Sequence, residues 1–157
     1  MILLPDDVQF HEDIRLLIYR PCGMLNEQSV DKIVRIIESL ESELHEPFNR
    51  FFDTSDHDEV ELNFRYVIQI SLYRVMSYLD RPPVKSAILA TDSTIMHYCQ
   101  LHAIITEDSP IKVRIFQELG GAAQWLGVSP QRLAAKSFAT EDEAKLSNGG
   151  TSSIKQQ

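Results

Sequence analysis

Residues 111–127 read IKVRIFQELGGAAQWLG and combine two different hydrophobic periodicities. In the first part, Ile111 and two further apolar residues alternate with basic ones, which predicts a half-exposed β-strand at the edge of a sheet. In the second part, apolar residues spaced three and four apart up to Leu126 predict a short helix. A glycine inside a helix costs about 1 kcal/mol relative to alanine, so we expect this helix to begin only after Gly121.

Upstream of this stretch, predicted strands and helices alternate along the chain. The predicted strands are residues 8–10, 14–19, 48–52, 84–90 and 111–116. The predicted helices are residues 27–45, 60–79, 94–105 and 122–126, with one more turn within residues 131–137. Alternation of this kind favours a mostly parallel sheet with right-handed crossovers. We therefore predict an α/β fold in which a mixed five-stranded sheet, mostly parallel with an antiparallel N-terminal hairpin, packs against four helices.

The composition indicates one globular domain. The chain has 157 residues, of which 43% are hydrophobic and 24% charged, as is typical of soluble domains. We expect a single domain over residues 1–137 and a disordered tail over residues 138–157, which are rich in Ser, Thr, Glu, Gly and Gln. Cys22 and Cys99 are far apart and form no CxxC motif, so neither a disulfide scaffold nor a zinc ribbon is expected.

The charge balance argues against two classes of partner. Lys and Arg number 15 against 23 Asp and Glu, which gives a net charge of −8. Such a chain is not expected to coat nucleic acid or an anionic membrane surface. No apolar run approaches ~20 residues, so integral membrane association is not expected either. The opening residues MILLPDD lack a basic segment and are too short for a signal peptide, which favours a cytoplasmic location.

The element order, together with Ala122-Ala123-Gln124-Trp125-Leu126-Gly127 at its end, resembles the SpoIIAA-like branch of the STAS superfamily. Members of that branch tend to end in a strand with an apolar-x-apolar-Phe pattern, here residues 113–116, and a helix closing on Ala-x-x-Trp-Leu. The resemblance covers residues 8–127. It implies a small α/β domain that binds and regulates rather than catalyses. Some relatives, including CRAL-TRIO-like ones, are thought to hold apolar ligands between helices and sheet.

The resemblance also directs attention to phosphorylation. STAS regulators carry a phosphorylatable Ser in an Asp-Ser-Ser-Gly-like motif at the start of the second long helix. The corresponding residues 53–61 contain Thr54 and Ser55 as candidate sites but lack that motif. The five acidic residues around them would repel an added phosphate.

Aromatic residues and methionines on the second and third predicted helices suggest where a ligand would bind, because such side chains adapt to irregular apolar molecules. We expect Phe64, Ile68 and Met76, on the inner face of the helix over residues 60–79, to line a space between helices and sheet together with Met96. The alternative interpretation is that these residues simply form the hydrophobic core.

Two hypotheses about function follow, and neither involves catalysis or a cofactor. In the first, an exposed helix face or the edge strand docks a partner protein or a second copy of the chain. In the second, the domain is a carrier or sensor of a lipid-like apolar molecule. A contiguous exposed apolar patch favours the first hypothesis, and an enclosed cavity of roughly 300 Å³ or more favours the second.

A third hypothesis, an enzyme, rests on Cys99 and His102. Their spacing of three residues places them on one helix face, and a thiolate nucleophile needs a nearby base. The alternative is a packed apolar stripe. His97 lies about 140° from His102 around the helix, so the two do not favour one metal ion. The acidic residues 53–61 lack the spacing of a calcium-binding loop, and no metal site is predicted.

Three basic residues, Arg74, Arg81 and Lys85, cluster in sequence around the end of the second predicted helix. Positive charge is favourable at a helix C-terminus, which is the simpler interpretation. The alternative is that they bind an anionic head group or the carboxylates of a partner.

Overall fold

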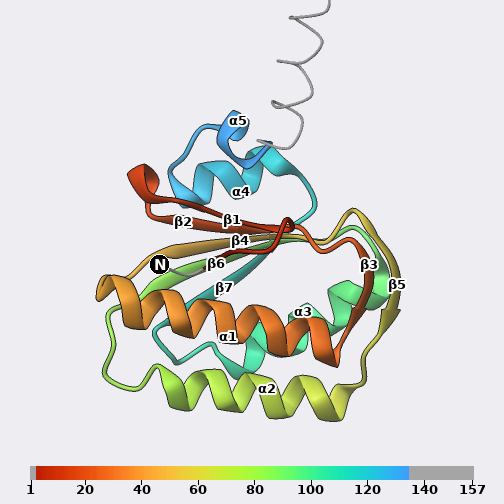
Figure 1. Cartoon of the computed structure of the whole chain (residues 1–157). Coiled ribbons are helices and arrows are strands. Elements are labelled where there is room, and N and C mark those ends of the chain that lie inside the picture. The colour runs from red at the N-terminus through yellow and green to blue at the C-terminus, as the bar shows by residue number, and fades with distance from the viewer. Residues whose placement is uncertain (1–2, 135–157) are drawn as a thin grey trace, which may run out of the picture.

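The computed structural model describes residues 3–134, and these confirm the predicted fold class (Figure 1). The main sheet contains β1 (Val8–His11), β2 (Leu16–Tyr19), β4 (Asn49–Asp53), β6 (Val84–Leu89) and β7 (Ile111–Phe116). The helices are α1 (Glu27–Leu44), α2 (Phe64–Ser77), α3 (Ser93–Ile105), α4 (Leu119–Leu126) and α5 (Pro130–Leu133). The strand order is β1-β2-β4-β6-β7, with β1 antiparallel to β2 and the other neighbours parallel. The last strand is therefore at an edge, as predicted.

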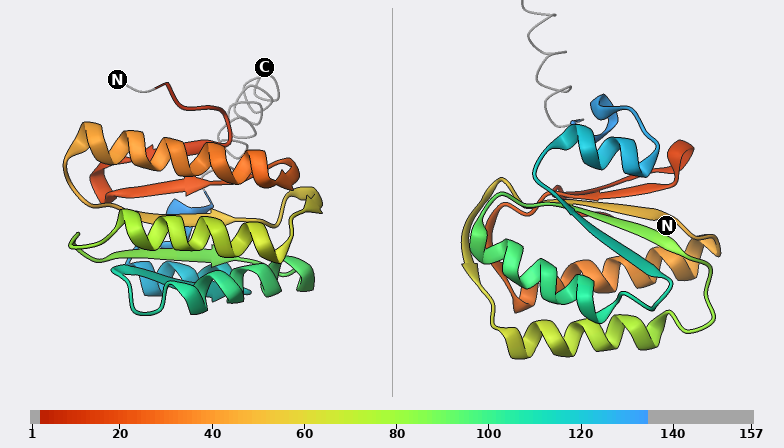
Figure 2. Two further views of the ribbon diagram at one scale, coloured as in Figure 1. Left: turned by 90° about the horizontal axis from the view of Figure 1, so that it is seen from below. Right: turned by 180° about the vertical axis from the view of Figure 1, so that it is seen from behind.

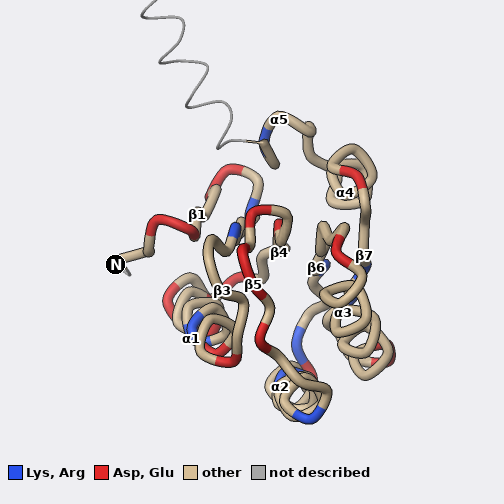
Figure 3. Tube along the Cα trace, turned by 90° about the vertical axis from the view of Figure 1, so that its right-hand side faces the viewer, with Lys and Arg blue, Asp and Glu red and all other residues tan. Residues whose placement is uncertain are grey.

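The helices cover the two faces of the sheet unequally. α4 and α5 lie on one face, and α1, α2 and α3 lie on the other (Figure 1). Seen from below, α2 lies between α1 and α3 (Figure 2, left), and in the end-on view it is farther from the sheet than either of them (Figure 3). Helix α2 thus forms a second layer beneath α1 and α3.

Each strand divides its side chains between the two faces, as alternation requires. Leu16, Ile18 and Phe51 point toward α4, where they pack against Ala122 and Leu126. On the opposite face, Leu17 and Tyr19 pack against Ile33 and Ile37 of α1. Strand β2 is buried on both faces, as predicted for a central strand.

The predicted start of α1 is confirmed by its cap. The Asn26 side chain accepts a hydrogen bond from the Ser29 backbone N–H at 2.9 Å, and Ser29 Oγ accepts one from the Asn26 N–H at 2.9 Å. This reciprocal pair satisfies two donors that the first helical turn leaves unpaired. The helix ends where His45 adopts the left-handed conformation, with φ of 59°.

The segment between β4 and α2 differs from the prediction. Residues expected to form a loop and the first turn of a helix instead form β5 (His57–Glu61), which pairs in parallel with β3 (Gly23–Asn26). Helix α2 begins at Phe64, because the Asn63 side chain caps it by accepting from the Tyr66 N–H at 2.8 Å. The predicted start near residue 60 is therefore wrong.

The start of α4 is also earlier than predicted. The helix begins at Leu119 and includes both glycines. A Cβ at Gly121 would lie 3.2 Å from Cδ1 of Phe116, so glycine allows the close approach of this ring. Tertiary packing here outweighs low helix propensity. The predicted tail, residues 138–157, lies outside the described residues.

None of the helices within residues 3–134 combines the length and apolar character needed to cross a membrane.

Candidate functional site

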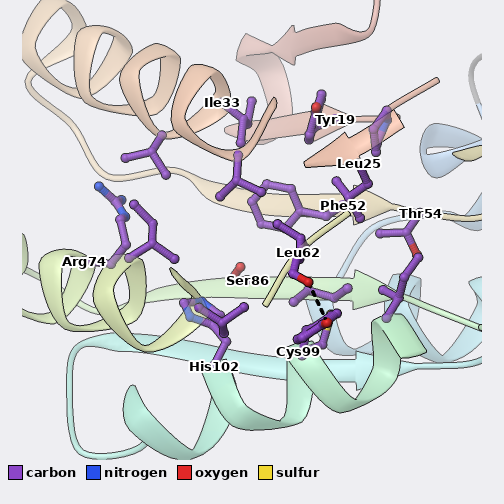
Figure 4. A pocket seen from close by; sticks show the side chains of 18 of the residues that line it. Tyr19, Leu25, Ile33, Phe52, Thr54, Leu62, Arg74, Ser86, Cys99 and His102 are labelled. Atoms are coloured by element: carbon purple, nitrogen blue, oxygen red, sulfur yellow. Dashed lines mark hydrogen bonds between the residues drawn. The ribbon is translucent and has the colours of Figure 1, made fainter. Parts of the chain in front are cut away.

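A mostly apolar cavity lies beneath the sheet, in the space between the sheet and α2. Its volume is about 180 Å³. It is lined by apolar side chains of α1, α2 and α3 and by inward-facing residues of the central strands, among them Val34, Val67, Ile95, Phe52 and Ile88 (Figure 4). Helix α2 lies farther from the sheet than α1 and α3 do, so a space remains between α2 and the central strands.

The cavity is smaller than the roughly 300 Å³ expected for a lipid-like ligand. An apolar cavity of about 150 Å³ in another protein holds benzene, so 180 Å³ suits a molecule of about six to ten non-hydrogen atoms. The size therefore fits a small organic molecule better than a lipid.

One end of the cavity is polar, and two arginines form it. Arg50 projects from β4 and Arg74 from α2, and their side chains are only 2% and 7% exposed. Both contact the carboxylate of Glu41: Arg50 Nη2 donates to Oε2 at 3.0 Å, and Arg74 Nη2 lies 3.9 Å from Oε1. Arg74 lies at the end of the cavity opposite Thr54 (Figure 4), and the shared contact with Glu41 places Arg50 at that end as well.

A third arginine completes the group, which we call the arginine cluster (Arg50, Arg74 and Arg81). Arg81 Nη1 lies 3.6 Å from Glu41 Oε2 and is half exposed. All three guanidinium groups lie 4.9–5.4 Å from the ring centroid of Tyr78, whose hydroxyl accepts a short hydrogen bond from Arg50. Such cation–π contacts are favourable for guanidinium groups. The predicted grouping of Lys85 with Arg74 and Arg81 is wrong, since Lys85 Nζ donates to the Trp125 carbonyl at 2.8 Å.

The arginine cluster is incompletely satisfied. Within residues 3–134, Arg74 Nη1 and Arg50 Nε are buried and have no hydrogen-bond partner. Burial lowers the pKa of Arg74 and lowers the pKa of Arg50 to about 10, although Glu41 opposes both shifts. Both side chains still carry their charge at neutral pH. Buried charged donors without partners are costly, which marks this end of the cavity as a candidate binding site.

The structure places the predicted ligand-lining residues elsewhere. Phe64, Ile68 and Met76 are 54%, 41% and 67% exposed and are absent from the cavity lining, so their placement between helices and sheet is wrong. Met96 is half-buried and packs beside Ile88, also outside the lining. Whether any of the four binds a ligand stays a prediction.

Polar contacts decide which face of α2 turns inward. The Tyr66 hydroxyl donates to Asp31 Oδ1 at 2.5 Å, and Ser71 Oγ lies 2.7 Å from His102 Nδ1. With Arg74 and with Val67, which was predicted to face inward, they form the buried face, whereas Phe64, Ile68 and Met76 turn outward. The result is an exposed row, which we call the outer stripe: Phe64, Ile68, Leu72 and Met76 on α2, and Leu79 just after its end.

Cys99 and His102 both line the cavity, but their chemistry does not favour nucleophilic catalysis. Burial raises the pKa of the Cys99 thiol to about 12, so the thiol is protonated at neutral pH. Burial and the nearby Arg74 charge lower the pKa of His102 to about 4, so the imidazole is neutral. Its Nδ1 is engaged by Ser71. A protonated thiol is a weak nucleophile.

We expect the two cysteines to react at very different rates with a thiol-specific reagent. Cys22 is exposed, whereas Cys99 lines the cavity with its thiol protonated. One equivalent of thiol per chain should react quickly with Ellman's reagent, and the second only on unfolding. In Cys22→Ser the fast phase should disappear. Rapid modification of Cys99 in the folded variant would revive the enzyme hypothesis.

The buried imidazole predicts a pH dependence of stability. The pKa of His102 is about 4 in the folded protein and about 6.5 when unfolded, so the unfolded state binds more protons between these values. The free energy of unfolding should therefore fall by about 2 kcal/mol between pH 7 and pH 5 because of this group. Urea titrations should show that His102→Gln removes this component. The matched variant His97→Gln, at an exposed position of α3, should retain it, and equal slopes in both variants would contradict the assignment.

The two candidate phosphorylation sites differ in access. Thr54 is buried and its hydroxyl donates to the Leu89 carbonyl at 2.8 Å. Ser55 is exposed, and its backbone N–H and hydroxyl both donate to the Asp53 carboxylate. Phosphorylation of Ser55 would place two anionic groups together. Phosphorylation at either residue stays a prediction. Within residues 3–134, no three His, Cys, Asp or Glu side chains are grouped as a metal site requires.

Comparison with known proteins finds similarity to a solved structure but to no known sequence family. No protein-family model and no curated protein sequence matches the chain. Among solved structures, a similar chain is an uncharacterized protein of the DUF3478 family from Shewanella loihica PV-4, described as having a SpoIIAA-like fold. The two chains are 15% identical, with 76% of this chain and 90% of that chain covered and a TM-score of 0.49.

Proposed function

We propose that the domain is a non-catalytic binding module that associates with a second copy of itself through the outer stripe of α2. The observation that carries this proposal is the exposure of five large apolar side chains, between 41% and 67% each, four along α2 and the fifth just after its end. A contiguous exposed apolar patch on a soluble protein is characteristic of an interaction surface.

The spacing of the outer stripe favours a second copy as the occupant. Four of its residues, Phe64, Ile68, Leu72 and Met76, recur every fourth position, which forms a continuous ridge on the helix. If two copies of α2 pack antiparallel about a two-fold axis, Ile68 faces Leu72 of the second copy and Phe64 faces Met76 of the second copy. Both contacts are apolar, and a thioether beside an aromatic ring is favourable. The stripe is thus self-complementary, as a two-fold interface requires.

The distribution of charge is compatible with this arrangement. Two chains of net charge −8 repel each other in general, yet residues 63–79 contain two arginines and no acidic residue. The acidic side chains gather elsewhere, for example on α1 and along β5 (Figure 3). Two copies can therefore meet at α2 without bringing carboxylates together.

Sedimentation velocity of the full chain tests the proposal. A single pair of helices forms a small interface, so we expect a dimer with a dissociation constant of about micromolar. The sedimentation coefficient should rise from the monomer to the dimer value across about two decades of concentration around that constant. A chain that stays monomeric throughout would overturn the proposal.

A second candidate function, binding of a small apolar molecule, is favoured by a separate observation. The cavity of about 180 Å³ is bounded on one side by α2 and is mostly apolar. The cavity is lined by the inner face of α2, whereas the proposed dimer forms through the outer face. The two functions therefore do not compete for the same residues.

A further inference from the structure

We propose that the cavity binds a small carboxylic acid, with its apolar tail among α1, α2 and α3 and its carboxylate at Arg74 and Arg50. This inference rests on the second candidate function, that the cavity holds a ligand at all. It adds the chemical class of that ligand and the residues that recognise it.

Two buried guanidinium donors beside this end of the cavity lack an acceptor. Arg74 Nη1 and Arg50 Nε are buried without a hydrogen-bond partner within residues 3–134, and both side chains line the cavity. The contacts that Arg74 does make are long, at 4.0 Å to Glu38 and 3.9 Å to Glu41. A guanidinium group presents several donors in a planar fork that matches a carboxylate. A ligand carboxylate would supply the acceptor that Arg74 lacks.

The count of charges favours a head group with one negative charge. The arginine cluster carries three positive charges, and two carboxylates contact it, those of Glu41 and Glu38. Counting these ion pairs within the described residues 3–134, the cluster has one positive charge more than the carboxylates that contact it. His102, at the same end, is neutral at pH 7 and adds none. A monoanionic carboxylate balances the group, whereas a dianionic phosphate would leave it negative.

The lining and volume of the rest of the cavity determine which ligand tail fits. Apart from its arginine end, the lining is mainly aliphatic and aromatic, with Val34, Ile37, Val67 and Ile70 facing the space. A volume of about 180 Å³ accommodates about six to ten non-hydrogen atoms. Hexanoate, with eight, has the right size and polarity.

A surface groove adjoins the cavity at the same place. It has a volume of about 420 Å³ and is lined by Glu38, Glu41, Tyr78 and Arg81, and Arg74 borders both spaces. An acid could therefore lie in the cavity or in the groove, and the test must separate the two positions.

The test is a nuclear magnetic resonance titration of the full chain with hexanoate and with hexan-1-ol, a neutral probe of similar size. We expect both to shift resonances of cavity-lining residues, with hexanoate binding about tenfold more tightly because of its charge-assisted hydrogen bonds. This comparison needs no variant. If hexan-1-ol binds the cavity as tightly as hexanoate, the acid inference fails while cavity binding stands; if neither binds, cavity binding itself fails.

Two variants locate the carboxylate and the tail. Arg74→Met should reduce hexanoate affinity to that of hexan-1-ol and leave hexan-1-ol binding unchanged. Ile70→Phe, which fills the apolar part, should abolish binding of both probes. Circular dichroism establishes that each variant is folded. Hexanoate binding that survives Ile70→Phe would place the acid in the surface groove and overturn the proposal.

Discussion

Replacing Glu41 with glutamine is expected to lower the free energy of unfolding by about 3 to 5 kcal/mol, because it breaks a buried network of ion pairs. The Glu41 side chain is only 10% exposed and is the carboxylate that all three arginines of the cluster contact. Glutamine keeps the shape but removes the charge, which leaves the buried Arg50 and Arg74 uncompensated. The melting temperature should fall by about 10 °C.

The matched control for this substitution is Glu38→Gln. Glu38 also approaches Arg74, but at 4.0 Å and with its side chain 35% exposed. Exposed pairs contribute little, so the loss should stay below about 1 kcal/mol. Urea unfolding of both variants measures the difference. If Glu41→Gln costs no more than Glu38→Gln, the arginine cluster is not held by this carboxylate.

Replacing Leu72 with glutamate is expected to weaken dimerisation by more than about a hundredfold while leaving the monomer folded. In the proposed dimer, Leu72 lies near the centre of the interface, so a carboxylate there would lose its hydration without gaining a partner. In the monomer Leu72 is 53% exposed, so the free energy of unfolding should change by no more than about 0.5 kcal/mol. Sedimentation velocity and urea unfolding measure the two quantities separately.

Controls for the Leu72 variant test both the surface and the register. Ile104→Glu makes a similar change at a residue of α3 that is 68% exposed, and it should leave the dimer intact. The antiparallel register places Ile68 opposite Leu72 of the second copy. A mixture of Ile68→Lys and Leu72→Glu chains should therefore form mixed dimers in preference to either homodimer. Equal weakening by Ile104→Glu, or no preference for mixed dimers, would contradict the arrangement.

The local parts of the fold could be predicted from the sequence. Helix α1 has a cap residue, Asn26, followed by apolar residues at helical spacing, and both signals act within a few residues. The β3–β5 pair could not be predicted in this way, because its pairing joins segments more than thirty residues apart in the chain. Its second strand is also strongly acidic, which is more typical of a solvent-exposed loop.

The orientation of α2 could not be predicted from its own residues. Apolar side chains occur all around this helix, so spacing alone does not select the inner face. The selection comes from distant partners: Asp31 for Tyr66, and His102 for Ser71. At the polar end of the cavity, the sequence singled out Arg74 and Arg81 but missed Arg50, although a lone arginine within a predicted buried strand requires a partner.

The most direct test of the proposed interface is intermolecular paramagnetic relaxation. A spin label is attached at Gln69→Cys, an exposed position beside the outer stripe, in a Cys22→Ser chain that is not isotope-labelled. This chain is mixed with ¹⁵N-labelled chain that carries no spin label. In the proposed dimer, amide signals of α2 in the ¹⁵N-labelled chain should broaden, while those of α4 on the opposite face of the sheet should not. Absence of broadening at dimer-forming concentrations, or broadening centred on another element, would contradict it.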